Sequence, residues 1–152
     1  MVLNAGQLAP DFTLIDQHGE EVTLSDELQE QPVALVFFPL AFSGICTGEL
    51  CELRDNPELF ETPGVKLFAI SVDSKFALRA WADAESYGFQ LLSDFWPHGQ
   101  VAKDYGVFIE ERGVATRATV VIGQDGKIAA SFENAPSEAR NLEMYEEALA
   151  KL

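Results

Sequence analysis

Two apolar runs constrain the fold of this chain more than any other feature. Residues 32–38 read PVALVFF, and residues 65–72 read VKLFAISV. Both runs are rich in β-branched and aromatic side chains, which is typical of strands that helices bury on both faces. A helical pattern runs between them from Ser43 to about Phe60, followed by a break at Pro63-Gly64. A strand, a helix and a strand in this order predict one unit of a parallel sheet.

The rest of the chain adds strands and helices around this unit. Alternating segments on either side of His18-Gly19 predict a small hairpin at the edge of the domain. A helix is predicted over residues 74–87, with Ser74 as its cap and with Phe76, Ala77, Ala80, Trp81 and Ala84 on one face. Trp81 is expected to pack in the core. The remaining expectations are a short strand at 89–92, a loop or short helix at 97–105, a strand at 118–122, a turn at 124–126 into another strand, and a closing helix at 137–152. This pattern favours a thioredoxin-like α/β sandwich and also permits other small α/β folds.

Length and charge limit the classes of function. A chain of 152 residues is long enough to form one domain, residues 1–152, with a core that needs no disulfide or metal. Ten Lys and Arg residues against 25 Asp and Glu residues give a net charge of −15. This charge repels phosphate backbones and anionic membrane surfaces, so we expect no nucleic-acid or membrane partner. We find no basic leader and no segment long enough to cross a bilayer, so the expected location is the cytoplasm.

Both cysteines lie in one short stretch, PLAFSGICTGELC at residues 39–51. Cys46 follows the first buried strand directly, at the point where the helical pattern begins, and Ser43 is available to cap the free backbone amides there. The positive field at a helix N-terminus favours the thiolate over the thiol, and the thiolate is the nucleophile. Cys46 is therefore the candidate reactive group.

The same stretch resembles the peroxidatic-cysteine motif of the peroxiredoxins, P-x-x-x-[T/S]-x-x-C. Pro39, Ser43 and Cys46 match it, and further similarity covers APDFTL at 9–14, LLSDFWPHG at 91–99 and GVATRATVVI at 113–122. The chain resembles most the AhpE-type one-cysteine members of this AhpC/TSA superfamily. The resemblance implies a thioredoxin-like fold of the peroxiredoxin type, with a central mixed β-sheet flanked by helices. It also implies a thiol peroxidase without haem, flavin or metal.

Site residues follow from the resemblance by position. Cys46 corresponds to the peroxidatic cysteine, Ser43 and Arg117 to residues that surround the peroxide, and Pro39 to the residue that shields the sulfur. Attack by sulfur on one peroxide oxygen leaves negative charge on the other, which preorganised donors stabilise. Arginine suits this task because its donors form a fixed, charged fork. Without the resemblance, an arginine that enters a strand would more commonly form a surface ion pair.

Glu49 lies one turn after Cys46, where it could orient Arg117 through a charged hydrogen bond. A solvated acidic side chain is the competing interpretation. Neither His18 nor His98 has metal-ligand spacing to the two cysteines, so no zinc site is expected.

Five aromatic residues near the motif form a further group: Phe37, Phe38, Phe42, Phe95 and Trp96. Most of this group is expected in the core, while part of it could wall the thiol pocket or form a subunit contact. Because this face supports dimers in AhpE-type relatives, the resemblance implies a homodimer.

Cys51 departs from the AhpE-type pattern. It matches the resolving cysteine of the peroxiredoxin Q group, also called bacterioferritin comigratory proteins, and this match implies an intramolecular Cys46–Cys51 disulfide. On an intact helix the two Cα atoms would be roughly 8.6 Å apart, whereas a disulfide needs less than about 7 Å. The first helical turns must therefore unwind, which Gly48 would make easier. The alternative is that Cys51 is simply a small buried residue on the helix face.

The sequence thus predicts a peroxidase that reduces hydrogen peroxide and organic hydroperoxides. Electrons would come from thioredoxin-, mycothiol- or glutaredoxin-type thiols. A thiol-disulfide reductase is an alternative, although the spacing here is C-x-x-x-x-C and not the C-x-x-C of that class. A redox-sensing interaction module is a second alternative, because the same oxidised cysteine could signal to a partner.

Overall fold

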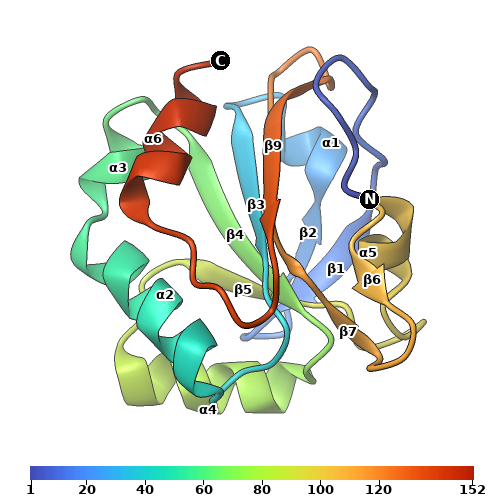
Figure 1. Cartoon of the computed structure of the whole chain (residues 1–152), viewed down its shortest axis with the longest axis vertical. Helices are drawn as coiled ribbons and strands as arrows, with labels where there is room; N and C mark the ends of the chain where they lie inside the picture. Colours follow the sequence, from blue (N-terminus) through green and yellow to red (C-terminus); the bar gives the residue numbers. More distant parts are fainter.

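A seven-stranded mixed sheet runs through the centre of the molecule (Figure 1). The computed structural model describes residues 1–152. The strands lie in the order β2-β1-β5-β4-β3-β8-β9. Their bounds are Thr13–Asp16 for β1, Glu21–Thr23 for β2, Val33–Phe37 for β3, Lys66–Ser71 for β4, Gln90–Ser93 for β5, Arg117–Ile122 for β8 and Ile128–Asn134 for β9. A separate small sheet pairs β6 (Phe108–Ile109) with β7 (Val114–Ala115).

Six helices pack around this sheet. They are α1 (Leu24–Glu27), α2 (Gly44–Asp55), α3 (Glu58–Glu61), α4 (Lys75–Glu85), α5 (Gln100–Asp104) and α6 (Leu142–Leu149). Figure 1 shows α2, α3 and α6 on one side of the sheet and α1 and α5 on the other. None of the helices is both long and apolar enough to cross a lipid bilayer. The predicted central mixed sheet with flanking helices is confirmed.

The two apolar runs form β3 and β4, which pair in parallel from Val33 opposite Lys66 to Phe37 opposite Ile70. All five residues of β3 are buried, as expected of a strand with helices over both faces. On its other side β3 pairs antiparallel with β8, with Val36 opposite Thr119. This pairing brings the start of β8 to the end of β3, where the chain enters α2.

Alternating side chains of the sheet feed two core layers. Val33, Leu35 and Phe37 pack toward α1 and α5, whereas Ala34 and Val36 pack toward α2, α3 and α6. Trp81 of α4 lies fully inside a third cluster with Cys46, which confirms that it is a core residue. Phe76 is 76% exposed, so the prediction that it shares one face of the helix with Trp81 is wrong. Two residues on a helix correspond to a rotation of about 200°, so Phe76 faces away when Leu78 faces inward.

Two predicted helices have different bounds in the structure. The helix expected from Ser43 to about Phe60 is divided into α2 and α3, because proline disfavours helical geometry in the residue before it and Asn56 precedes Pro57. The closing helix starts at Leu142, later than expected, where the Asn141 side chain accepts a hydrogen bond from the Met144 amide. Asn141 therefore sets this helix start.

Three local start and turn signals are confirmed. Ser74 caps α4 by accepting a hydrogen bond from the Ala77 amide. The β1–β2 hairpin lies at the sheet edge and turns through Gly19 at φ +83°. Gly126, also at φ +83°, turns β8 into β9. Glycine suits both turns because it adopts positive φ without steric cost.

Candidate functional site around Cys46

Cys46 lies in the first turn of α2, directly after the loop that leaves β3. Its side chain is fully buried and packs with Phe38, Leu50 and Trp81. The free amides at the start of α2 create a positive field around the sulfur. The helix that carries this thiol is continuous from Gly44 to Asp55.

Arg117 begins β8 and reaches the thiol across the sheet. Its Nη1 atom donates a hydrogen bond to Cys46 Sγ at 3.2 Å. Its Nε atom donates to the Pro136 carbonyl at 2.7 Å, which fixes the plane of the guanidinium. Arg117 is only 3% exposed, so it is not part of a surface ion pair. A permanent positive charge is therefore in contact with the sulfur.

Glu49 is buried one turn after Cys46 and accepts a hydrogen bond from Arg117 Nη1 at 2.6 Å. The solvated interpretation of this side chain is therefore wrong. Burial alone would raise the pKa of Glu49. The hydrogen bonds and charge of Arg140, together with the charge of Arg117, outweigh burial and hold the pKa of this carboxyl below its ordinary value.

Arg140 completes the charged network, although the sequence did not predict a role for this residue. Its backbone amide and Nε atom donate to Glu49 Oε2 at 2.6 and 3.0 Å. Its Nη1 atom donates to the Ala118 carbonyl and to Thr119 Oγ1. Arg140 lies in a loop before α6, with no periodic pattern or motif around it. The only available signal was that a buried carboxylate needs cationic partners.

Ser43 occupies the position before the first helical residue of α2, but its hydroxyl does not cap the helix. The Oγ atom instead donates to the Leu40 carbonyl at 2.9 Å, so the predicted capping bond is wrong. Pro39 starts the same loop and is partly buried. Asp73 anchors this loop by accepting a hydrogen bond from the Ala41 amide at 2.8 Å. Phe42 has φ +67°, an uncommon backbone conformation for a residue with a side chain.

Cys51 is partly buried two turns along α2, and both cysteines are free thiols. Its Sγ atom donates to Glu85 Oε2 at 3.4 Å and lies 3.5 Å from the Tyr87 hydroxyl. Because the helix between the cysteines is intact, their Cα atoms are roughly 8.6 Å apart by helix geometry. A bond between the two sulfurs therefore requires this part of α2 to open.

The aromatic group near the motif is split by the fold. Phe37 and Phe38 are core residues, while Phe42, Phe95 and Trp96 are 58%, 54% and 81% exposed. Phe42 lies against Trp81 with ring centroids 6.2 Å apart, so it covers the core cluster that contains Cys46. The other two exposed rings line a shallow cavity together with Phe76.

The amino-acid sequence matches the model of the AhpC/TSA family over residues 5–131. The chain belongs to the AhpC/TSA family. It is 46% identical over 151 residues to alkyl hydroperoxide reductase E of Mycobacterium tuberculosis, with 99% of each chain covered. It is 38% identical over 138 residues to peroxiredoxin Bcp of Escherichia coli, with 87% of this chain and 86% of the relative covered.

Solved structures agree with this assignment. Peroxidoxin BcpB of Mycobacterium tuberculosis matches with a TM-score of 0.85 at 30% identity, covering 98% of this chain and 96% of the other. The reduced 2-Cys peroxiredoxin of Plasmodium vivax matches with a TM-score of 0.87 at 27% identity, covering 97% and 81%. The chain is thus a peroxiredoxin with the thioredoxin-like fold, and peroxiredoxins are thiol peroxidases. This assignment favours the peroxidase over the thiol-disulfide reductase.

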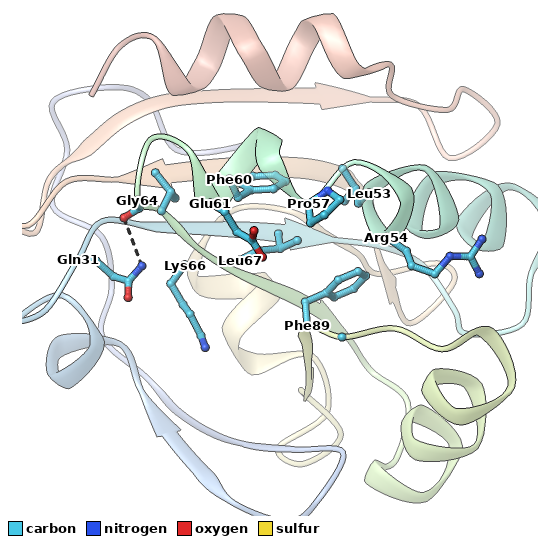
Figure 2. Close-up of a pocket in the computed structure, with 12 residues that line it drawn as sticks. Gln31, Leu53, Arg54, Pro57, Phe60, Glu61, Gly64, Lys66, Leu67 and Phe89 are labelled. Carbon is cyan, nitrogen blue, oxygen red and sulfur yellow. Dashed lines mark hydrogen bonds between the residues drawn. The ribbon is translucent and has the colours of Figure 1, made fainter.

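The protein also has a cavity of about 430 Å³, and Cys46 does not line it. Its lining includes Leu53, Phe60, Lys66 and Phe89, and it contains none of the candidate site residues that the sequence predicted (Figure 2). Arg54 lies at its edge, with its guanidinium directed away from the other lining residues (Figure 2). The candidate site around Cys46 is therefore separate from this cavity. No group of three or more His, Cys, Asp and Glu side chains is arranged to hold a metal ion.

Proposed function

We propose that Cys46 is the peroxidatic cysteine of this peroxiredoxin and that it reduces hydrogen peroxide and organic hydroperoxides. The observation that carries the proposal is the hydrogen bond from Arg117 Nη1 to Cys46 Sγ at 3.2 Å, at the N-terminus of α2. The thiolate attacks one peroxide oxygen, so that a sulfur–oxygen bond forms as the oxygen–oxygen bond breaks. The leaving oxygen takes a proton and departs as water or an alcohol, and Cys46 becomes a sulfenic acid.

The surrounding donors stabilise the charge that develops on the leaving oxygen. Arg117 is already fixed by three hydrogen bonds, to Cys46, Glu49 and the Pro136 carbonyl, so it needs little reorganisation. Ser43 and the Cys46 amide supply the neutral donors, and Ser43 must turn from the Leu40 carbonyl to contact the peroxide. Pro39 shields the sulfur from bulk water. Glu49 orients Arg117 and is itself held by Arg140.

Cys51 resolves the sulfenic acid in our proposal. Attack by its sulfur on Cys46 forms an intramolecular disulfide and releases water, after the helix between them has opened. Gly48 favours this opening, since glycine weakens a helix interior by about 1 kcal/mol relative to alanine. A thioredoxin-, mycothiol- or glutaredoxin-type thiol then reduces the disulfide. This thiol chemistry belongs in a reducing compartment, for which we propose the cytoplasm.

We further propose that residues 1–152 act as one peroxiredoxin domain that assembles as a homodimer. The support for assembly is the exposed apolar surface formed by Phe76, Phe95 and Trp96 on a chain of otherwise strongly acidic composition. Exposed aromatic clusters are typical of protein–protein interfaces. Trp96→Glu should shift the sedimentation coefficient from that of a dimer to that of a monomer. A wild-type protein that sediments as a monomer would contradict this assembly.

The catalytic proposal is tested by peroxide consumption and by intact mass. Wild-type protein should consume hydrogen peroxide and cumene hydroperoxide with a thiol reductant, and Cys46→Ser should consume neither while keeping its circular dichroism spectrum. Cys51→Ser is the matched control, because it removes the other thiol and should still reduce the first equivalent of peroxide. Turnover by Cys46→Ser would refute the choice of nucleophile.

The resolving step is read from the mass after one equivalent of peroxide without added thiol. Wild-type protein should lose two hydrogens, whereas Cys51→Ser should gain one or two oxygens at Cys46. If wild-type protein instead keeps one added oxygen, the peroxidase uses one cysteine and Cys51 has no resolving role.

A further inference from the structure

The thiol of Cys51 has a carboxylate beside it. Cys51 Sγ donates a hydrogen bond to Glu85 Oε2 at 3.4 Å. Glu85 is the last residue of α4, 34 residues along the chain, so the contact joins two helices. The mechanism described above leaves this carboxylate without a role.

Arg54 holds Glu85 in position from one turn further along α2. Its Nη1 atom donates to the Glu85 backbone carbonyl at 2.7 Å and lies 3.6 Å from Glu85 Oε2. Its Nε atom is paired with Asp55 at 2.8 Å. Figure 2 shows that the guanidinium points away from the other residues that line the nearby cavity. Arg54 thus holds the Glu85 side chain beside Cys51, where an ionised carboxylate can accept a proton.

Tyr87 closes the other side of the cluster. Its hydroxyl lies 3.5 Å from both Cys51 Sγ and the Thr47 carbonyl. Its ring packs against Trp81 and Phe89, and burial raises the pKa of Tyr87, so it remains a neutral phenol. The hydroxyl can position the sulfur but is a poor proton acceptor. Glu85 is therefore the group in contact with Cys51 that can take the thiol proton.

We propose that Glu85 is the general base of the resolving step. The proposal rests on the role of Cys51 given above. Glu85 takes the proton of the Cys51 thiol, and the thiolate attacks Cys46 Sγ. The sulfur–sulfur bond forms as the sulfur–oxygen bond of the sulfenic acid breaks. The leaving hydroxide takes up the proton that Glu85 removed and departs as water. The Glu85 carboxylate is thereby restored. Cys51 is oxidised and the sulfenic sulfur of Cys46 is reduced.

The anchoring of α2 fits this role. Leu53 is buried in the core and Arg54 is bonded to the Glu85 carbonyl, so the C-terminal half of the helix is held in place. Gly48 lies in the half that must open, and a side chain there would contact nothing within 4 Å. Opening around Gly48 moves Cys46 toward Cys51 and leaves Cys51 beside its base.

The test compares Glu85→Gln with Glu52→Gln, which removes the same charge from an exposed residue next to Cys51. Each protein is mixed with one equivalent of peroxide, quenched with acid at intervals and measured by intact mass. The added oxygen reports the peroxide step, and the later loss of two hydrogens relative to the starting protein reports the disulfide. Glu85→Gln should keep the wild-type peroxide step and slow disulfide formation about 100-fold at neutral pH. Glu52→Gln should resemble wild type in both steps.

The pH profile separates a base from a structural support. Without its base, the variant must lose the thiol proton to solvent, so its resolving rate should rise more steeply with pH than that of wild type. Glu85→Asp should restore part of the rate. An unchanged resolving rate in Glu85→Gln overturns the proposal, and so does a slower rate with the wild-type pH profile. If wild-type protein forms no disulfide at all, the role of Cys51 fails, while consumption of peroxide by Cys46 still reports the peroxidase.

Discussion

Arg117 and Cys46 are joined by a hydrogen bond of 3.2 Å although 71 residues separate them in the sequence. The same Nη1 atom also contacts Glu49 at 2.6 Å. One nitrogen therefore connects the reactive sulfur to a buried carboxylate. The guanidinium is held in a fixed geometry between these two groups.

Arg117→Lys should slow the reaction of the protein with hydrogen peroxide by about 100-fold, the usual effect of losing one donor to a developing oxyanion. Lysine keeps the charge but cannot donate at once to Cys46, Glu49 and the Pro136 carbonyl. Stopped-flow measurement of the second-order rate constant checks this. Arg79→Lys, on the exposed surface of α4, is the control and should react like wild type. An unaltered rate in Arg117→Lys would exclude a role for the guanidinium fork.

Glu49 makes the stability of the protein depend on pH. Its pKa in the folded protein lies below the ordinary value of 4.5, so the unfolded state binds more protons in this range. The stabilisation from Glu49 is therefore present above about pH 4.5 and is lost as the pH falls through the folded-state pKa. Chemical denaturation between pH 3 and 7 should show this loss in wild type and a smaller one in Glu49→Gln.

Glu49→Gln should also lower the free energy of unfolding at pH 7 by about 3–5 kcal/mol, because Arg117 and Arg140 remain buried without their carboxylate. Glu61→Gln, at an exposed position, should change the stability by less than about 0.5 kcal/mol. If the two variants lose similar amounts of unfolding free energy, the buried network stabilises the protein no more than a single surface charge does.

Gly48→Ala should slow formation of the Cys46–Cys51 disulfide. The added methyl group meets no atom within 4 Å, so it fits without strain and stabilises α2 by about 0.5–1 kcal/mol. If helix opening limits the resolving step, this corresponds to a rate about 2- to 5-fold lower. The longer-lived sulfenic acid should then give more sulfinic acid at Cys46 under excess peroxide, measured by peptide mass. A disulfide rate equal to that of wild type would show that opening around Gly48 is not limiting.

Asp73→Ala should weaken the reaction with peroxide because the Ala41 amide loses its acceptor and the loop from Pro39 to Ser43 loses its anchor. Asp73→Asn keeps one carbonyl oxygen and should retain most of the rate. The expected loss in Asp73→Ala is about 10-fold, equal to the net contribution of one charged hydrogen bond of about 1.5 kcal/mol. If the alanine and asparagine variants are equally slow, charge and not the anchoring bond is the cause.

Local sequence patterns are sufficient to predict the β3–α2–β4 unit and the place of Cys46 at its strand-to-helix junction. These features depend on local periodicity and on residues next to one another in the chain. The resemblance to peroxiredoxins added Arg117 and Cys51, and the fold brings Arg117 to Cys46 because β8 pairs antiparallel with β3. Local sequence patterns do not predict the pairing of β8 with β3, since strand order depends on contacts between distant segments.

The partners of the buried and half-buried charges and thiols depend on contacts between distant segments. Arg140 meets Glu49 across 91 residues, and Glu85 meets Cys51 across 34. Neither contact leaves a pattern in the sequence, because an arginine in a loop and a glutamate at a helix end look like ordinary surface residues. In the fold Arg140 is buried, and the Glu85 side chain is 33% exposed and contacts Cys51. The Ser43 hydroxyl is a smaller example. Its position in the sequence predicts a helix cap, whereas in the structure it donates to the Leu40 carbonyl. Burial makes each unpaired charge costly, and the fold therefore selects partners that the one-dimensional sequence leaves open.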